Sequence, residues 1–108
     1  MTPQDLHELY EAVDAAADRL RTLPESRLRR GAAAEGLALA SELTSRAQRL
    51  EVPYGAPRRL PEVGIYAVGD QVAVCGYDLA RAVTDAREDD PAARRALAEA
   101  LDLLRRYR

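Results

Sequence analysis

Hydrophobic residues recur at alternating intervals of three and four along residues 3–22, where they form the seam Leu6, Leu9, Val13, Ala16, Leu20 and Leu23. This spacing places apolar side chains on one face of an α-helix. Thr2 can cap its first turn, and Pro3 has a backbone geometry that suits the first helical position. The pattern therefore predicts a helix at about 3–22, which Pro24 ends.

A second helix is predicted at about 27–50, with one apolar stripe formed by Leu28, Ala32, Gly36, Leu39, Leu43, Ala47 and Leu50. A second stripe widens the apolar arc and consists of Ala33, Leu37, Ala40 and Thr44. Such an arc predicts contacts on two sides of the helix. Because a short chain with few large apolar side chains buries a modest core, we expect the second side to support a homodimer.

The segment RLRRGAAAEGLALA, residues 27–40, has two glycines at the spacing of a phosphate-binding loop. That motif needs a preceding strand and a Lys-Ser/Thr pair after the second glycine, whereas here Leu37 follows and a helix precedes. The phosphate-loop interpretation is therefore rejected. Close packing against another helix is the favoured use of the small residues Gly31, Ala32, Ala34, Gly36, Ala38 and Ala40.

Three prolines and two glycines in residues 52–64 exclude a helix there and predict an ordered crossover or an exposed arm. Tyr54 and Tyr66 bracket this segment and are expected to anchor it to the domain or to contact a partner.

Residues 64–75 have two interpretations. A turn at Gly69 and Asp70 would join two strands into a short β-hairpin. The stripe Val68, Val72, Cys75, Leu79 and Val83 instead predicts a helix at about 67–87. The helix is favoured because an isolated hairpin needs a sheet to pair with, and the sequence shows no other strand.

Asp90 and Pro91 repeat the cap-and-proline start and predict a last helix at about 91–107, with Ala93, Leu97, Leu101 and Leu104 facing inward. The predicted fold is a single all-α domain, residues 1–108, built as an antiparallel bundle of four helices. The alternative is an α+β domain with the hairpin at 64–75.

The charge balance does not favour nucleic acid, because 18 acidic residues outweigh 16 basic ones and the net charge is −2. All basic residues are arginine, and lysine and asparagine are absent, a composition typical of genes with high G+C content such as actinobacterial ones. The single cysteine excludes an intrachain disulfide and fits a reducing cytoplasm. No signal peptide or membrane-spanning apolar run is present, so we expect a cytoplasmic protein.

Five arginines are expected to meet at one end of the helical hairpin: Arg19, Arg21, Arg27, Arg29 and Arg30. Such a cluster can bind an anion. In an up-down-up-down bundle, however, the last connection lies at the same end and carries the acids Asp85, Glu88, Asp89 and Asp90. Neutralisation by these acids, within the chain or across a dimer, is the favoured interpretation. Nucleic acid is not the expected partner, because no helix-turn-helix or set of stacking aromatics accompanies the arginines.

Two further sets of residues have candidate chemistry. Gln71, Cys75 and Asp78 occupy adjoining helical positions and could line a small polar pocket, although a role in helix register or plain exposure is favoured. His7 and Glu11 lie one helical turn apart, but two ligands are too few for a specific metal site. No catalytic framework is found, so no enzyme, cofactor or metal is expected.

The sequence thus predicts a non-enzymatic helical protein–protein interaction module that self-associates. One alternative is a small regulatory protein that binds nucleic acid or an acidic partner through the five arginines. A second alternative is a small-ligand binder that uses the polar residues near position 75.

Overall fold

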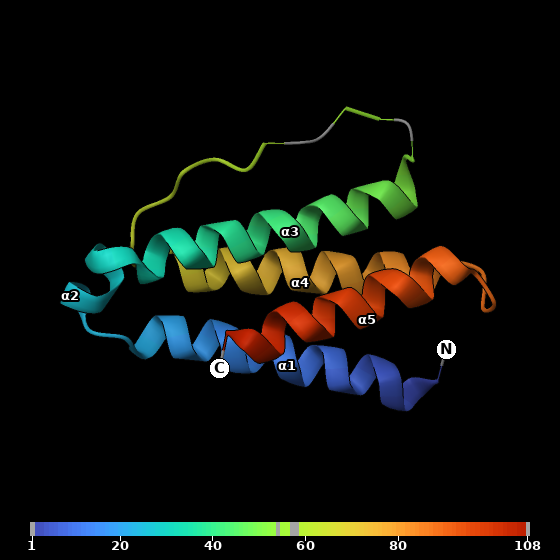
Figure 1. The fold of residues 1–108 in the computed structure, drawn as a ribbon, viewed down its shortest axis with the longest axis horizontal. Coiled ribbons are helices and arrows are strands. Elements are labelled where there is room, and N and C mark those ends of the chain that lie inside the picture. The colour runs from blue at the N-terminus through green and yellow to red at the C-terminus, as the bar shows by residue number, and fades with distance from the viewer. Residues whose placement is uncertain (1, 54, 57–58, 108) are drawn as a thin grey trace.

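The computed structural model describes residues 2–53, 55–56 and 59–107 and contains four long helices (Figure 1). These helices are α1 (Pro3–Thr22), α3 (Ala33–Glu51), α4 (Val68–Asp85) and α5 (Pro91–Arg106). No strand occurs among the described residues, so the all-α bundle is confirmed and the alternative hairpin at 64–75 is wrong. Gly69 and Asp70 lie in the first turn of α4 instead.

Side-chain caps fix the starts of two of the helices. Thr2 Oγ1 accepts a hydrogen bond from the Asp5 amide at 3.2 Å, and the Asp5 carboxylate accepts one from the Thr2 amide at 3.0 Å. Before α5, Asp90 Oδ1 accepts from the Ala92 amide at 2.9 Å. These bonds satisfy amides that the helix itself leaves without partners. The predicted starts at Pro3 and Pro91 are confirmed.

The predicted second helix is broken before α3. A single turn, α2 (Glu25–Arg27), leads into a π-helical turn, η1 (Leu28–Ala32), which contains a kink. Gly31 has φ 143° and ψ −17°, the only positive φ among the described residues. A Cβ added to Gly31 would have no atom within 4 Å. Backbone conformation therefore requires this glycine, and the expectation that it allows close helix packing is wrong.

We predict that Gly31→Ala lowers the free energy of unfolding by about 1–3 kcal/mol, because an L-residue is strained at this φ. The matched control is Gly64→Ala, since a Cβ on Gly64 would also have no atom within 4 Å and this residue does not have a left-handed φ. We expect the control to leave stability unchanged or slightly higher. Equilibrium denaturation by urea measures both variants, and equal effects would contradict the conformational explanation.

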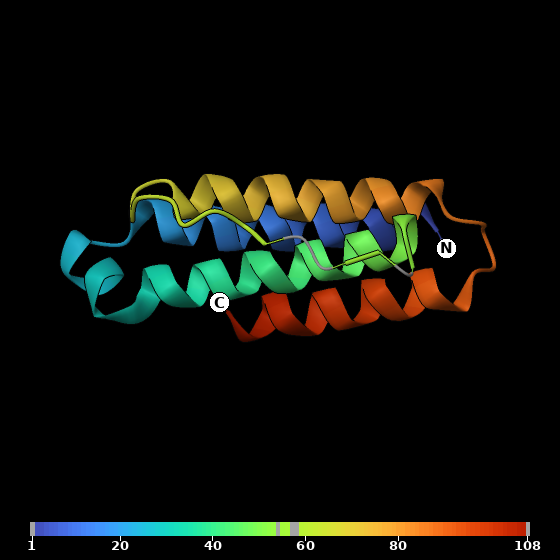
Figure 2. The ribbon, with the colours of Figure 1, turned by 90° about the horizontal axis from the view of Figure 1, so that it is seen from above.

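The connection between α3 and α4 determines the topology. It returns along the length of the bundle, so α4 begins where α3 begins and runs parallel to it (Figures 1 and 2). At that end, a Cβ on Gly36 of α3 would lie 3.0 Å from Val68 Cγ2 of α4. The expected up-down-up-down order is therefore wrong. The acids between α4 and α5 lie at the end of the bundle opposite α2, so they do not neutralise the arginines within one chain, and neutralisation across a dimer stays a prediction (Figure 1).

Glycines set the closest helix contacts. A Cβ on Gly69 would lie 2.9 Å from the Ala17 carbonyl oxygen, and one on Gly76 would lie 2.5 Å from Val13 Cγ1. Real Cβ atoms do not come this close, so these glycines allow α1 and α4 to approach each other. Gly36 has the close-packing role expected from the sequence, with Leu20 Cδ1 only 3.0 Å from a Cβ placed there.

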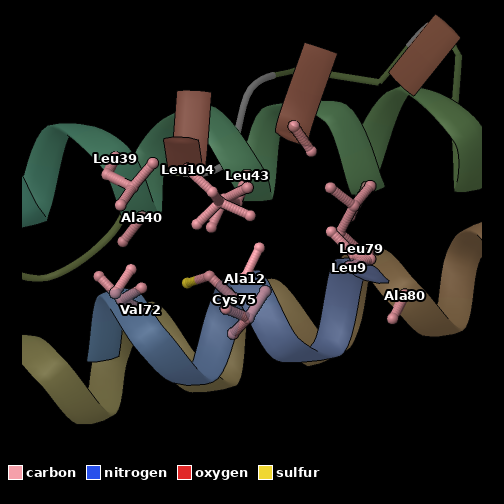
Figure 3. Packing of buried hydrophobic residues seen from close by; sticks show 14 of the residues in the cluster. Leu9, Ala12, Leu39, Ala40, Leu43, Val72, Cys75, Leu79, Ala80 and Leu104 are labelled. Carbon is pink, nitrogen blue, oxygen red and sulfur yellow. The ribbon is translucent and has the colours of Figure 1, made fainter. Parts of the chain in front are cut away.

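The first apolar stripe of α3 is largely buried within the chain, and the second is buried in part. Leu43 is fully buried and faces Leu104 of α5 (Figure 3). On the second stripe Ala40 is also fully buried and Thr44 lies beside Cys75 of α4, whereas Ala33 and Leu37 stay partly exposed. The two-sided arc therefore reflects contacts with α4 and α5 and does not by itself require a second copy. Self-association remains a prediction, but α3 is not the basis for it.

Candidate functional site

A pocket of about 300 Å³ lies at the end of the bundle where α1 and α5 both finish. Four arginines from four elements line it: Arg19 of α1, Arg27 of α2, Arg30 of η1 and Arg106 of α5. We call this site the arginine pocket; its other lining residues are Leu23, Gly31, Ala32, Glu35 and Tyr107.

The kink and the last turn of α5 build this arrangement. Gly31 lines the pocket where the chain turns from η1 into α3. The Tyr107 hydroxyl donates a hydrogen bond to the Ala32 carbonyl oxygen at 3.1 Å, which ties the end of α5 to η1. Burial, with a smaller contribution from the Glu35 carboxylate, raises the pKa of Tyr107. The hydroxyl therefore stays protonated at neutral pH and keeps donating.

The predicted arginine cluster divides into two groups. Arg21 is paired, because its guanidinium lies 2.6 Å from Asp70 Oδ1 and 3.0 Å from Asp18 Oδ1. Arg29 lies 2.7 Å from Glu25 Oε1. Hydrogen bonds to these carboxylates raise the pKa of both arginines, with Asp70 contributing most at Arg21.

The other three predicted arginines, Arg19, Arg27 and Arg30, have no ion pair with any residue that the structure describes. The same holds for Arg106, which sequence reasoning missed. It missed this residue because the assumed helix order placed the last helix end at the opposite side of the molecule. Glu35 is the one acid among the residues that line the pocket, so the positive charges there outnumber the negative ones.

The predicted polar pocket does not form from its three residues. Cys75 is 4% exposed and faces the core beside Thr44, whereas Asp78 is exposed. Gln71 turns toward the crossover, where its Nε2 donates to the Pro61 carbonyl oxygen at 3.0 Å. Burial raises the pKa of the Cys75 thiol, so the nucleophilic thiolate is disfavoured.

A second pocket of about 340 Å³ lies between the crossover and the first turns of α3 and α4. Its lining is mainly apolar, and its polar members are Arg29, Glu62 and Gln71. Gln71 Oε1 is buried and has no hydrogen-bond partner among the described residues. Because Arg29 is already paired with Glu25, this pocket has less free positive charge than the arginine pocket.

Tyr66, at the end of the crossover, has its hydroxyl near the Glu25 carboxylate of α2, and burial followed by this carboxylate raises the pKa of Tyr66. Its side chain otherwise remains 69% exposed. The pKa of Glu25 is lowered, first by Arg29 and then by Tyr66. Tyr54, the other tyrosine expected to act as an anchor, lies outside the described residues.

At the start of α1, His7 Nε2 contacts the Glu11 carboxylate. Within 2–53, 55–56 and 59–107, no group of three or more His, Cys, Asp or Glu residues is placed to hold a metal ion. None of the helices in the described part of the chain combines the length and apolar character needed to cross a membrane.

Comparison with models of known protein families, with curated proteins and with solved structures finds no match for this chain. No relative therefore contributes an activity or a ligand. Among the described residues, the arginine pocket has the most definite binding chemistry, because it gathers four cations without carboxylate partners.

Proposed function

We propose that this protein is a non-enzymatic helical interaction module whose arginine pocket binds an acidic segment of a protein partner. The observation that carries the proposal is the convergence of four arginines, which have no ion pair with a described residue, around one pocket. Carboxylates of a bound segment would supply the missing negative charge. Guanidinium groups bind carboxylates through two parallel hydrogen bonds, which gives such an interface geometric specificity.

The dimensions of the pocket favour an acidic protein segment over nucleic acid. Its volume of about 300 Å³ is confined to one end of the bundle, whereas a duplex contacts an extended basic surface. The exposed tyrosines Tyr10, Tyr66 and Tyr77 lie outside its lining. Tyr107 is the one aromatic residue in the lining, so the pocket has no series of rings on which successive bases could stack. The net charge of −2 also opposes a long polyanion.

The apolar part of the lining refines the expected partner. Leu23 and the ring of Tyr107 are partly buried beside the arginines and offer a contact for one hydrophobic side chain. Glu35 opposes the binding of negative charge at the same site. The favoured partner therefore has several carboxylates and one apolar residue close together. A cytoplasmic setting, in which the lone thiol of Cys75 stays reduced, is part of the proposal.

We expect the triple variant Arg19→Ala/Arg30→Ala/Arg106→Ala to weaken binding of a fluorescent peptide with five glutamates and one leucine at least about tenfold. Charged hydrogen bonds of about 1.5–3 kcal/mol each would be lost, and about 1.4 kcal/mol corresponds to a tenfold change. Fluorescence anisotropy at low and moderate salt measures the dissociation constant. Glu35→Gln is expected to strengthen binding, because it removes the opposing charge.

The matched control is Arg87→Ala/Arg94→Ala/Arg105→Ala, which removes the same charge at exposed positions outside the pocket. We expect it to retain most of the affinity. Equal losses in the two triple variants would show that net charge, rather than the pocket, attracts the peptide. Tighter binding of a DNA duplex than of the peptide would also contradict the proposal.

A further inference from the structure

The outer side of α4 has four exposed residues at intervals of four, three and four: Asp70, Val74, Tyr77 and Arg81. We call this stripe the α4 seam. Val74 is 58% exposed and Tyr77 42%, although both are large hydrophobic residues. The intervals are those of contact positions in a coiled coil. In Figure 2, α4 forms one side of the bundle and no other helix lies outside it.

The α4 seam is complementary in charge to the same seam of a second copy that runs in the opposite direction. If two copies of α4 cross in antiparallel orientation between Val74 and Tyr77, each valine faces the tyrosine of the other copy. In the same register Asp70 faces Arg81 of the second copy, and twofold symmetry repeats this pair at the other end. We propose that the chain forms a homodimer through the α4 seam, with an apolar centre and an opposite-charge pair at each end.

Each charged residue of the seam already has a partner within the chain, but each keeps polar atoms for a second partner. Asp70 Oδ1 accepts hydrogen bonds from Arg21, with 2.8 Å to Nε, and this contact holds the carboxylate in place. Arg81 uses its Nε toward Asp85 Oδ2 at 3.2 Å, which leaves its terminal nitrogens for another carboxylate. A second copy can therefore add a charge pair at each end without breaking the pairs that exist in the monomer.

Helix α1 extends the apolar centre of the seam. The rings of Tyr10 and Tyr77 lie 5.6 Å apart between centroids, at an interplanar angle of 46°. The Tyr77 hydroxyl donates to the Asp14 carboxylate, which fixes the orientation of the ring. A second copy would cover Tyr10, Val74 and Tyr77, which the monomer leaves exposed to water.

The α4 seam and the arginine pocket are separate sites. No residue of α4 lines the arginine pocket, so the two sites share no residue of this helix. This inference does not depend on what binds there.

Sedimentation velocity at micromolar concentration tests the proposal by charge reversal. We expect a dimer for the wild-type chain. Asp70→Arg and Arg81→Asp, each alone, place like charges opposite each other at both ends and should raise the dimer dissociation constant at least about tenfold, which is about 1.4 kcal/mol. An equimolar mixture of the two variants should recover the dimer, because a mixed pair has opposite charges at both ends.

The controls are Asp102→Arg and Arg105→Asp, which make the same charge changes at exposed positions of α5. We expect both to remain dimeric. Circular dichroism checks that Asp70→Arg stays folded after it loses the Arg21 contact. A wild-type chain that stays monomeric at several hundred micromolar would overturn the proposal. The proposal is also overturned if the mixture of the two variants forms no more dimer than either variant alone. The same holds if the α5 controls dissociate as much as Asp70→Arg and Arg81→Asp.

Discussion

Replacing Leu43 with alanine is expected to lower the free energy of unfolding by about 2–5 kcal/mol. Leu43 is 0% exposed and lies in the centre of the bundle, where it faces Leu104 (Figure 3). Removal of the side chain leaves a cavity that the surrounding helices can fill only partly. Because a small domain has about 5–15 kcal/mol of stability, this loss is a large fraction of the total. Equilibrium denaturation measures it.

Leu101→Ala is the matched control, since Leu101 is only partly buried at the edge of the same core. We expect a loss of about 1 kcal/mol there, in the range of ordinary point substitutions. If the two variants lost equal stability, the assignment of Leu43 to the fully buried part of the core would be contradicted.

Gly76→Ala is expected to destabilise the chain by about 1–3 kcal/mol, because the new methyl group would meet Val13 at 2.5 Å. To remove this overlap, α1 and α4 must separate along the line where they approach most closely. Combining Gly76→Ala with Val13→Ala should restore part of the lost free energy of unfolding, since the shorter side chain at position 13 makes room for the new methyl group. Denaturation of both single variants and the double variant gives the coupling free energy.

Gly69→Ala provides a contrast in the same helix pair. Its methyl group would meet the Ala17 carbonyl oxygen at 2.9 Å, and no side-chain substitution removes a backbone atom. We therefore expect Val13→Ala to relieve the effect at Gly76 but not at Gly69. Strictly additive effects at Gly76 and Val13 would contradict the close contact.

Local signals in the sequence predict much of the secondary structure. The caps at Thr2 and Asp90 are short-range hydrogen bonds, so the residues that form them are visible as neighbours in the chain. Helix α4 follows from the inward stripe that includes Val72 and Leu79, both fully buried. The competing turn signal at Gly69 is overridden because that glycine serves close packing against α1.

The topology and the kink at Gly31, in contrast, have no local signal in the sequence. Helical periodicity does not specify where a long proline-rich connection ends, so the direction of α4 could not be inferred. The assumed direction of α4 put the acids around Asp89 beside the arginines. It also put the end of the last helix, and with it Arg106, at the opposite end of the bundle. The positive φ of Gly31 is a conformation that periodicity does not report, and a glycine within an apolar stripe resembles one used for packing.

Only part of the candidate site could be predicted, because some of its contacts are local in the sequence and others depend on how the helices pack. The contact between Glu25 and Arg29 spans one helical turn and is foreseeable from their spacing. The contact between Arg21 and Asp70 joins residues far apart in the sequence and depends on how α1 and α4 pack. Arg19 and Arg30 lie in the pocket as members of the predicted cluster, but the separation of these arginines from the acids between α4 and α5 follows only from the topology.

A titration of the ¹⁵N-labelled protein with the five-glutamate peptide, followed by amide chemical shifts, tests the proposed function most directly. The expected result is that the largest changes occur at Arg19, Arg27, Arg30 and Arg106 and at the residues next to them. Amides of the α4–α5 connection, at the opposite end of the bundle, should not move. Changes centred on that connection, or none at all at saturating peptide, would contradict the assignment of the arginine pocket as the binding site.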